Sequence, residues 1–321
     1  MVHLVNLPYD LDSLQGYFSS AADVAQYLKD CGCDGAEIIY GERGAPSLIP
    51  PRLVGGYHLM FYAAWMDFWR EDTDALNREF GSAETWQEFY QGKRRMDLVR
   101  QLSRDLDRAQ YMGVPYVVFH VSEVTPEECY TYRWRYTDAE VVEVAAELIN
   151  ILLDGRGYTF EFLMENLPWS GLRFNDPEIT RLLLDRVHYP KKGLLLDTGH
   201  LMSTNPTLRD DAEALRYVHQ CLDEHGELCR YIRGVHLHKS LSGAYVQTHC
   251  GKPVSLPSDY YERFRVSYAH VLQIDRHEAL DTPQVRDLID RIQPAYLTHE
   301  VNAADWRAKR EGVRRQRQWF R

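Results

Sequence analysis

Residues 193–200 read Gly-Leu-Leu-Leu-Asp-Thr-Gly-His. The leucines form a short apolar run, which is typical of a strand in a parallel sheet when helical segments flank it. The run ends at Asp197, and His200 follows three residues later. The stretch therefore predicts a buried strand, Gly193–Asp197, with metal-binding side chains at its C-terminal end.

Seven further apolar runs alternate with longer segments of helical periodicity. The predicted strands are His3–Leu7, Ala36–Tyr40, Val54–Leu59, Tyr116–Val121, Phe160–Asn166, Gly193–Asp197, Arg233–His238 and Ala295–Val301. Apolar spacing of i, i+3, i+4 predicts helices at Ala21–Asp30, Lys93–Tyr111, Asp138–Leu153, Pro177–Arg186, Ala212–Glu224 and Thr282–Ile292. No glycine-rich phosphate loop follows the first strand and nothing marks a linker. We therefore expect an α/β fold, one (β/α)₈ TIM-barrel domain over residues 1–321.

Two connections are longer than the usual few residues. They run from Met60 to about Gly92, after the third strand, and from Lys239 to about Asp281, after the seventh. In a barrel both would be long loops on the C-terminal face, where substrates bind. The segment 302–321 is rich in basic residues, and we expect a terminal helix or tail packed on the barrel rather than a phosphate-binding arm.

Composition excludes several classes of protein. The chain has 321 residues, of which 45% are apolar, and a formal net charge of −10. Its charge disfavours nucleic acid, because binding to a phosphate backbone depends on Lys and Arg. The six cysteines lack the spacing of a zinc ribbon or a disulfide framework. No apolar stretch is long enough for a membrane span, so we expect a cytoplasmic protein with no membrane partner; whether it forms a homo-oligomer is left open.

Chemistry is concentrated where the apolar runs end. Six of them finish in His, Asp or Glu: His58, His120, Glu165, Asp197, His236 and Glu300. Each residue alone is more often a structural hydrogen-bonding group. In a barrel, however, these side chains converge on one axis, where unpaired buried carboxylates would repel one another. A divalent cation removes that repulsion, and mixed imidazole and carboxylate ligands suit zinc, manganese or iron.

These residues resemble the xylose-isomerase-like barrel superfamily, also called AP endonuclease family 2, over roughly residues 3–301. This superfamily includes sugar isomerases and epimerases and nucleases of the endonuclease IV type. Asp197-Thr198-Gly199-His200 resembles the Asp-Thr-x-His element of endonuclease IV, and Asp275-Arg276-His277 resembles its Asp-Arg-His element. The resemblance implies nine ligands for three zinc ions: His58, His120, Glu165, Asp197, His200, His236, Asp275, His277 and Glu300.

The same resemblance implies their distribution. His58 and His120 would hold a first ion, with Glu165 bridging to a second ion that Asp197, His236 and Glu300 complete. His200, Asp275 and His277 would hold a third ion, although about 38 residues separate His236 from Asp275, far more than in the nucleases. Sugar isomerases resemble only the subset Glu165, Asp197, His236 and Glu300, in which Glu165 and Glu300 move the proton. We expect Zn, with Mn or Fe as alternatives, and one to three ions per chain.

Substrate contacts are expected from the loops. The stretch Met60–Trp69, which includes Trp65, and the stretch Tyr130–Arg135, which includes Arg133 and Arg135, are aromatic. They either pack onto the barrel rim or form an apolar wall for a ligand. Lys239 and the two arginines could meet a phosphate. His238 shares the inward parity of His236, whereas His299 should point outward.

Three functions remain in competition. The favoured one is metal-dependent hydrolysis of a phosphoester in a small or medium-sized molecule, with Glu165 and Glu300 as catalytic carboxylates. A single-metal sugar or cyclitol isomerase or epimerase is the alternative, and an apurinic-site endonuclease is a second one. A barrel without catalysis, serving as a metal-stabilised binding protein, is the non-enzymatic possibility.

Overall fold

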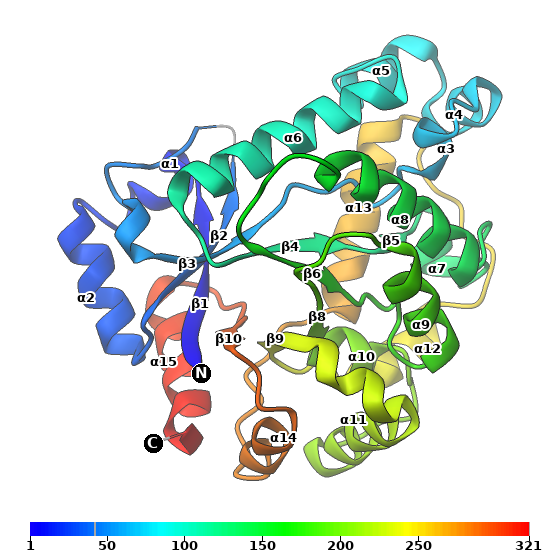
Figure 1. Ribbon diagram of the computed structural model, residues 1–321. Helices are drawn as coiled ribbons and strands as arrows, with labels where there is room; N and C mark the ends of the chain where they lie inside the picture. Colours follow the sequence, from blue (N-terminus) through cyan, green and yellow to red (C-terminus); the bar gives the residue numbers. More distant parts are fainter. Residues whose placement is uncertain (42, 321) are drawn as a thin grey trace.

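Eight parallel strands close into a barrel in the computed structural model, which describes residues 1–41 and 43–320. The hydrogen-bonded order is β1-β10-β9-β8-β6-β4-β3-β2, and β1 pairs with both β2 and β10. The barrel strands are β1 (Val2–Tyr9), β2 (Gly35–Tyr40), β3 (Val54–His58), β4 (Tyr116–His120), β6 (Glu161–Glu165), β8 (Lys192–Asp197), β9 (Ile232–Leu237) and β10 (Tyr296–His299). The predicted TIM barrel is therefore confirmed (Figure 1).

An outer layer of helices surrounds the strands (Figure 1). The longer ones are α2 (Ala21–Cys31), α6 (Arg95–Met112), α8 (Asp138–Leu153), α9 (Pro177–Arg186), α11 (Asp211–His225), α14 (Val285–Ile292) and α15 (Trp306–Arg317). Short α1 (Leu11–Leu14) follows β1, α10 (Thr198–Ser203) follows β8, and β5 (Ser122–Glu123) pairs with β7 (Ser170–Gly171). Among the described residues, no helix has both the length and the apolar composition needed to cross a membrane.

The two long connections are not irregular loops, which corrects the sequence prediction. The first contains α3 (Met66–Trp69), α4 (Thr73–Phe80) and α5 (Ala83–Phe89), and the second contains α12 (Gly243–His249) and α13 (Tyr260–Ile274). These helices begin at local caps, since Asp72 accepts a hydrogen bond from the Ala75 N–H and Asp259 from the Glu262 N–H. The predicted helix Thr282–Ile292 begins three residues late, at Val285, because the Thr282-Pro283-Gln284 segment forms a turn ahead of it.

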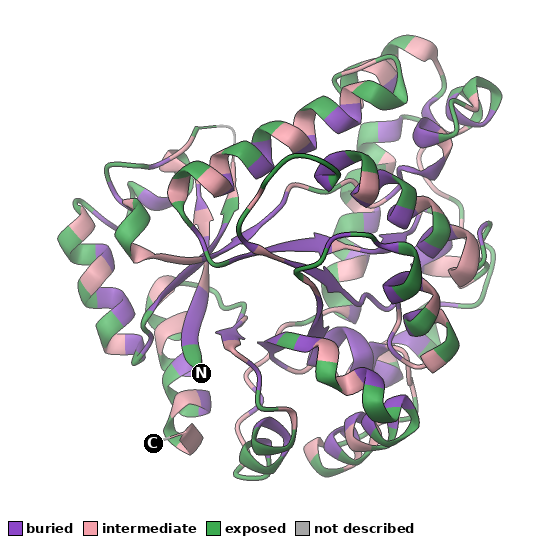
Figure 2. Cartoon of the chain, viewed as in Figure 1, coloured by how far each residue is buried: buried purple, intermediate pink, exposed green. Residues whose placement is uncertain are grey.

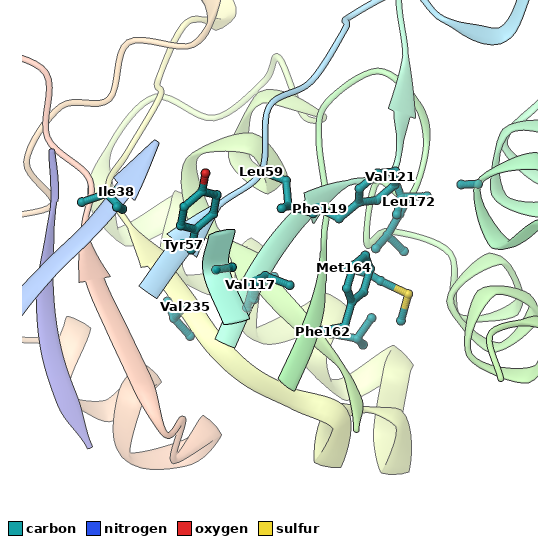
Figure 3. Close-up of a cluster of buried hydrophobic side chains, with 14 of the residues drawn as sticks. Ile38, Tyr57, Leu59, Val117, Phe119, Val121, Phe162, Met164, Leu172 and Val235 are labelled. Atoms are coloured by element: carbon teal, nitrogen blue, oxygen red, sulfur yellow. The ribbon is translucent and has the colours of Figure 1, made fainter. Parts of the chain in front are cut away.

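Alternation along the strands produces two apolar cores. Outward-facing residues such as Ile38, Val117 and Phe162 pack beneath the helices (Figure 3), and Figure 2 shows the strands buried while the helices alternate between buried and exposed faces. Inward-facing residues fill the base of the barrel: Leu4, Tyr116, Val118, Leu163 and Leu195. The base is a packed layer, so ligands must enter from the C-terminal end.

Gly56 provides the space for the largest side chain of this inner layer. A Cβ added to Gly56 would lie 2.3 Å from Cζ of Tyr116, a residue with no exposed surface. The hydroxyl of Tyr116 donates to Glu37 Oε2 at 2.5 Å, so the ring is held in place. The Tyr116 ring explains the glycine at position 56 of β3, and the Leu4 side chain explains Gly55, where an added Cβ would lie 2.4 Å from Leu4 Cδ2.

We predict that Gly56→Ala destabilises the protein by about 1–3 kcal/mol, because overpacking forces side chains off their rotamers. Urea unfolding monitored by circular dichroism measures this. Gly16→Ala is the matched control, since a Cβ there meets nothing within 4 Å. Equal midpoints for the two variants would contradict the assignment of Gly56 to the inner layer.

Candidate metal centre

The predicted ligands on the strands occupy inward-facing positions at the C-terminal, open end of the barrel. Three of them lie two residues beyond a residue of the inner layer: His120 follows Val118, Glu165 follows Leu163, and Asp197 follows Leu195. His200 comes from α10, and Asp275 and His277 follow α13. The ligand atoms form three groups, within each of which they lie within 4.8 Å of one another. The groups are cluster 1 (His58, His120, Glu165), cluster 2 (Glu165, Asp197, His236, Glu300) and cluster 3 (His200, His238, Asp275, His277).

Cluster 1 is two imidazoles facing one carboxylate oxygen. Nδ1 of His58 lies 2.9 Å from the carbonyl oxygen of Leu59, so this nitrogen carries the proton and Nε2 presents its lone pair. Nε2 of His58 lies 2.9 Å from Nε2 of His120, and both lie 3.2 Å from Glu165 Oε2. Two ring nitrogens that approach this closely beside a carboxylate fit a shared cation.

Cluster 2 surrounds Nδ1 of His236 with carboxylates. This nitrogen lies 2.9 Å from Glu300 Oε2, 3.1 Å from Glu165 Oε1 and 3.7 Å from Asp197 Oδ2. Glu300 Oε2 is buried without a hydrogen-bond partner among the described residues. Three carboxylates around one imidazole nitrogen form a donor set suited to a divalent ion.

Cluster 3 can form only if the long connection after β9 returns to the barrel mouth, and the structure shows that it does return there. Glu278 and Lys239 pair through two backbone hydrogen bonds, and the Ser240 hydroxyl donates to Asp275 Oδ1. Nε2 of His200 and Nε2 of His277 then lie 3.1 and 2.6 Å from Asp275 Oδ2. His277 adopts a left-handed φ of 48°, uncommon for a non-glycine residue and typical of functional sites.

His238 joins cluster 3, whereas the sequence suggested a residue that supports a ligand or contacts the substrate. Its ring stacks on that of His277 at 3.9 Å, and its Nε2 lies 2.8 Å from Asp197 Oδ2. It also explains the glycine in Asp197-Thr198-Gly199-His200, because a Cβ on Gly199 would lie 2.0 Å from the His238 ring. His238 thus connects clusters 2 and 3.

Opposite charges set the ionisation of these groups. Burial alone would raise the pKa of Glu165, but the facing rings of His236 and His120 hold it well below its usual range. His200 and His238 likewise lower the pKa of Asp197 to about 2, against the effect of its burial. Asp275 and Glu300 raise the pKa of His277 to about 9, again against burial. Burial opposes the charged form of the rings as well, but the facing carboxylates raise the pKa of His200 and His236 well above the usual range.

Glu37 is a positioning residue that the sequence reasoning missed. It lies in β2, is 2% exposed, and places Oε1 2.8 Å from Nε2 of His236. Its Oε2 accepts hydrogen bonds from Tyr116 and Thr298. The feature that could have revealed it is a single acidic residue inside the apolar run Ala36–Tyr40. Because this residue does not stand at the end of the strand, a search of the strand ends does not find it. Glu37 orients His236 so that Nδ1 faces cluster 2.

Lys309 is a second residue that sequence reasoning missed, within the basic segment 302–321. Its Nζ donates to Asn6 Oδ1 at 2.7 Å, and Asn6 Nδ2 lies 3.5 Å from Glu300 Oε1. Burial lowers the pKa of Lys309 to about 8, although the charge of Glu300 opposes this. The segment forms α15 and packs against the barrel; its final residue, Arg321, lies outside the described residues.

The predicted substrate contacts have protein partners of their own. The Trp65 indole N–H donates to the carbonyl oxygen of Ser122, Arg135 pairs with Asp67, and Lys239 pairs with Asp211. Arg133 is exposed. None of the four belongs to the three clusters, and their contact with a substrate stays a prediction. Phe61 instead lies at the site, 47% exposed, with its ring 4.2 Å from that of His120.

His299 points outward, as the strand alternation predicted. Its ring stacks on that of His3, on the side of the wall where Phe320 also packs. The desolvation of this buried ring lowers the pKa of His299 well below its usual range. His299 is therefore separated from cluster 2 by the strand that carries it.

The chain belongs to the xylose isomerase-like TIM barrel family, whose model matches residues 25–321. Similar solved structures include a D-tagatose 3-epimerase-like protein, with 13% identity and a TM-score of 0.56 over 100% of this chain and 97% of that one. A putative xylose isomerase from Rhodospirillum rubrum has 14% identity and a TM-score of 0.55, over 99% of both chains. Endonuclease IV from Thermus thermophilus has 17% identity and a TM-score of 0.51, over 100% of this chain and 99% of that one.

At these identities the likeness establishes the fold alone. A comparison with curated proteins found no match. The assignment to the family agrees with the resemblance drawn from the strand-end residues, and the neighbours include proteins named as epimerases or isomerases and a nuclease.

We predict that Glu37→Gln weakens metal binding at cluster 2 by about 10–100-fold, as is common when a group supporting a ligand is lost. Tyr116 and Thr298 both donate to Oε2, so the amide oxygen would take that position and the NH₂ group would face His236 Nε2. This arrangement favours a proton on Nδ1, the atom that should bind the metal.

A chelator-competition titration with Zn²⁺ measures the effect, with Glu147→Gln on the helix surface as the control. Unchanged affinity in Glu37→Gln would contradict the positioning role of Glu37.

We also predict that Zn²⁺ affinity rises with pH up to about 9. His277 keeps its proton until its pKa of about 9, and the pKa values of His200 and His236 are raised well above normal by carboxylates that outweigh burial. These protons must leave before a metal binds. Calorimetry in two buffers of different ionisation enthalpy should show proton release at neutral pH, and an affinity that does not change with pH would refute the expectation.

Proposed function

We propose that this chain is a metal-dependent hydrolase that cleaves a phosphoester bond in a small or medium-sized molecule. The observation that carries the proposal is the division of Glu165: Oε2 faces the imidazoles of cluster 1, while Oε1 lies 3.1 Å from Nδ1 of His236 in cluster 2. One carboxylate serving two donor sets is the arrangement of a multinuclear site.

Zinc is the ion that the donor set suits best, with manganese or iron as alternatives, because imidazoles and carboxylates mix in every cluster. The three clusters offer places for one to three ions. Divalent ions held there would provide an activated water nucleophile near neutral pH and neutralise charge on a phosphoester.

The chain's own residues divide the remaining work. Glu165 and Asp197 are almost completely buried and hold the site rigid, with 1% and 0% of their side chains exposed. Glu300 is 17% exposed, so it is the carboxylate of cluster 2 that a water or substrate can reach. We assign it the role of accepting a hydrogen bond or proton from the attacking water. Phe61 would pack against the leaving group at the rim.

A small substrate is favoured over duplex DNA. The net charge of −10 opposes the many phosphate contacts that a DNA-repair enzyme needs, which makes an apurinic-site endonuclease the weaker proposal. All six cysteines are free thiols, which fits a reducing compartment, and we place the activity in the cytoplasm.

Sugar isomerisation or epimerisation is the second candidate, and one observation favours it. Cluster 2 is a complete four-residue donor set on its own. In that case Glu165 and Glu300 would move a proton between adjacent carbons of a sugar or cyclitol, while clusters 1 and 3 would carry no ion.

Metal content and turnover distinguish the two candidates. We predict that the zinc-loaded protein holds more than one ion per chain by elemental analysis and hydrolyses a generic aryl phosphodiester. His277→Ala should lose the ion of cluster 3 and reduce turnover by about 100-fold or more, a barrier increase of about 2.7 kcal/mol.

Arg276→Ala, the neighbouring residue outside the clusters, is the matched control and should keep its metal content. A single ion per chain, together with sugar isomerisation that survives His277→Ala, would support the second candidate and refute the first.

A further inference from the structure

Lys309 is the basic residue of α15 that reaches the site. Arg310 pairs with Asp30 at 3.1 Å and Arg315 with Asp281 at 3.4 Å, so these two anchor the helix to neighbouring elements. Lys309 instead donates to Asn6 Oδ1. Asn6 has the inward parity of Leu4 on β1, and its amide lies 3.5 Å from Glu300 Oε1, so the amine lies beside β1 and the end of β10.

The ammonium group has few partners there. Among the described residues it donates one hydrogen bond, to Asn6 Oδ1, although an ammonium group has three N–H donors. Within the part of the chain that the structure describes, no carboxylate pairs directly with it, and its connection to Glu300 runs through Asn6 Nδ2 at 3.5 Å. A partly buried cation without a direct counter-ion is unfavourable unless an anion binds beside it.

The charge of a loaded site favours such an anion. Five acidic residues surround the mouth: Glu37, Glu165, Asp197, Asp275 and Glu300. Three divalent ions would exceed these charges by one, and Lys309 would make the excess two. Glu300 is one of these five, so its charge is already counted against the ions and does not additionally offset Lys309. The activated water, once it has lost a proton, would offset one of these charges; a neutral sugar would leave the other uncompensated, whereas a phosphate group would balance it.

We propose that Lys309 binds an oxygen of a phosphate group on the substrate, at the β1–β10 side of the mouth. The proposal rests on the proposed function and deepens it: the substrate is a phosphate ester that the amine of Lys309 and the metal clusters contact from different sides. Lys309 thereby contributes to substrate affinity rather than to metal binding.

Inorganic phosphate is the probe, titrated calorimetrically into the zinc-loaded full chain. Lys309→Met should weaken phosphate binding at least about tenfold, equivalent to about 1.4 kcal/mol, with zinc content unchanged. Lys309→Arg should restore most of the affinity because it restores the cation. Arg307→Met removes the same charge from an exposed position on the same helix and should bind phosphate like the wild type.

Kinetics with the aryl phosphodiester should show Lys309→Met acting mainly on KM. Equal phosphate affinity in the wild type and Lys309→Met, no phosphate binding by the wild type, or loss of zinc in Lys309→Met would each overturn the proposal. If phosphate binding depends on Lys309 while the wild type hydrolyses no phosphoester, the binding role stands and the proposed hydrolase function fails.

Discussion

The Glu165 carboxylate is the interaction on which the rest of the site depends. Its two oxygens face different groups of imidazoles, and only 1% of its side chain is exposed. A carboxylate so deeply buried is tolerable only when cations or protonated rings surround it. The positions of His58, His120 and His236 follow from this need, since each aims a ring nitrogen at one of the two oxygens.

The barrel meets that requirement through strand parity. Parallel strands bring their C-terminal ends to one rim, and alternation sends every second side chain inward. Below the rim these positions hold Leu163 and Leu195, and two residues later they hold Glu165 and Asp197. The apolar layer therefore supports a polar layer directly above it. A floor of this kind excludes water from beneath the carboxylates and fixes their backbone.

Most of the site could be predicted because its residues stand where strands end, a local feature of sequence. Asp275 and His277 required more, and the Asp-Arg-His element was sufficient despite the long insertion. Glu37 and Lys309 could not be found in this way. Glu37 lies in the middle of a strand, and its role becomes clear only from its contact with His236 across the barrel. Lys309 lies on a helix with several other basic residues, and only packing distinguishes it from them.

Helices inside the two long connections were missed for a related reason. Apart from α13, these helices have four to eight residues, so each shows only one or two turns of apolar periodicity. Their side chains pack partly on one another, as with Phe80 against Tyr260. Capping residues such as Asp72 and Asp259 were the sequence features that indicated these helices. A cap alone does not predict a short helix, because most helical stability comes from tertiary packing.

Lys239 and Glu278 give the second connection an unusual property. Their paired backbones clamp the segment at its base, so Asp275 and His277 are held by the clamp and by Ser240. Asp275 is also the C-cap residue of α13, where its N–H donates to the carbonyl oxygen of Val271, so the part that can vary in length is the stretch ahead of α13, which includes α12. In evolutionary terms this stretch is an exchangeable module, through which a barrel of this family could acquire a new substrate while the candidate metal ligands keep their positions.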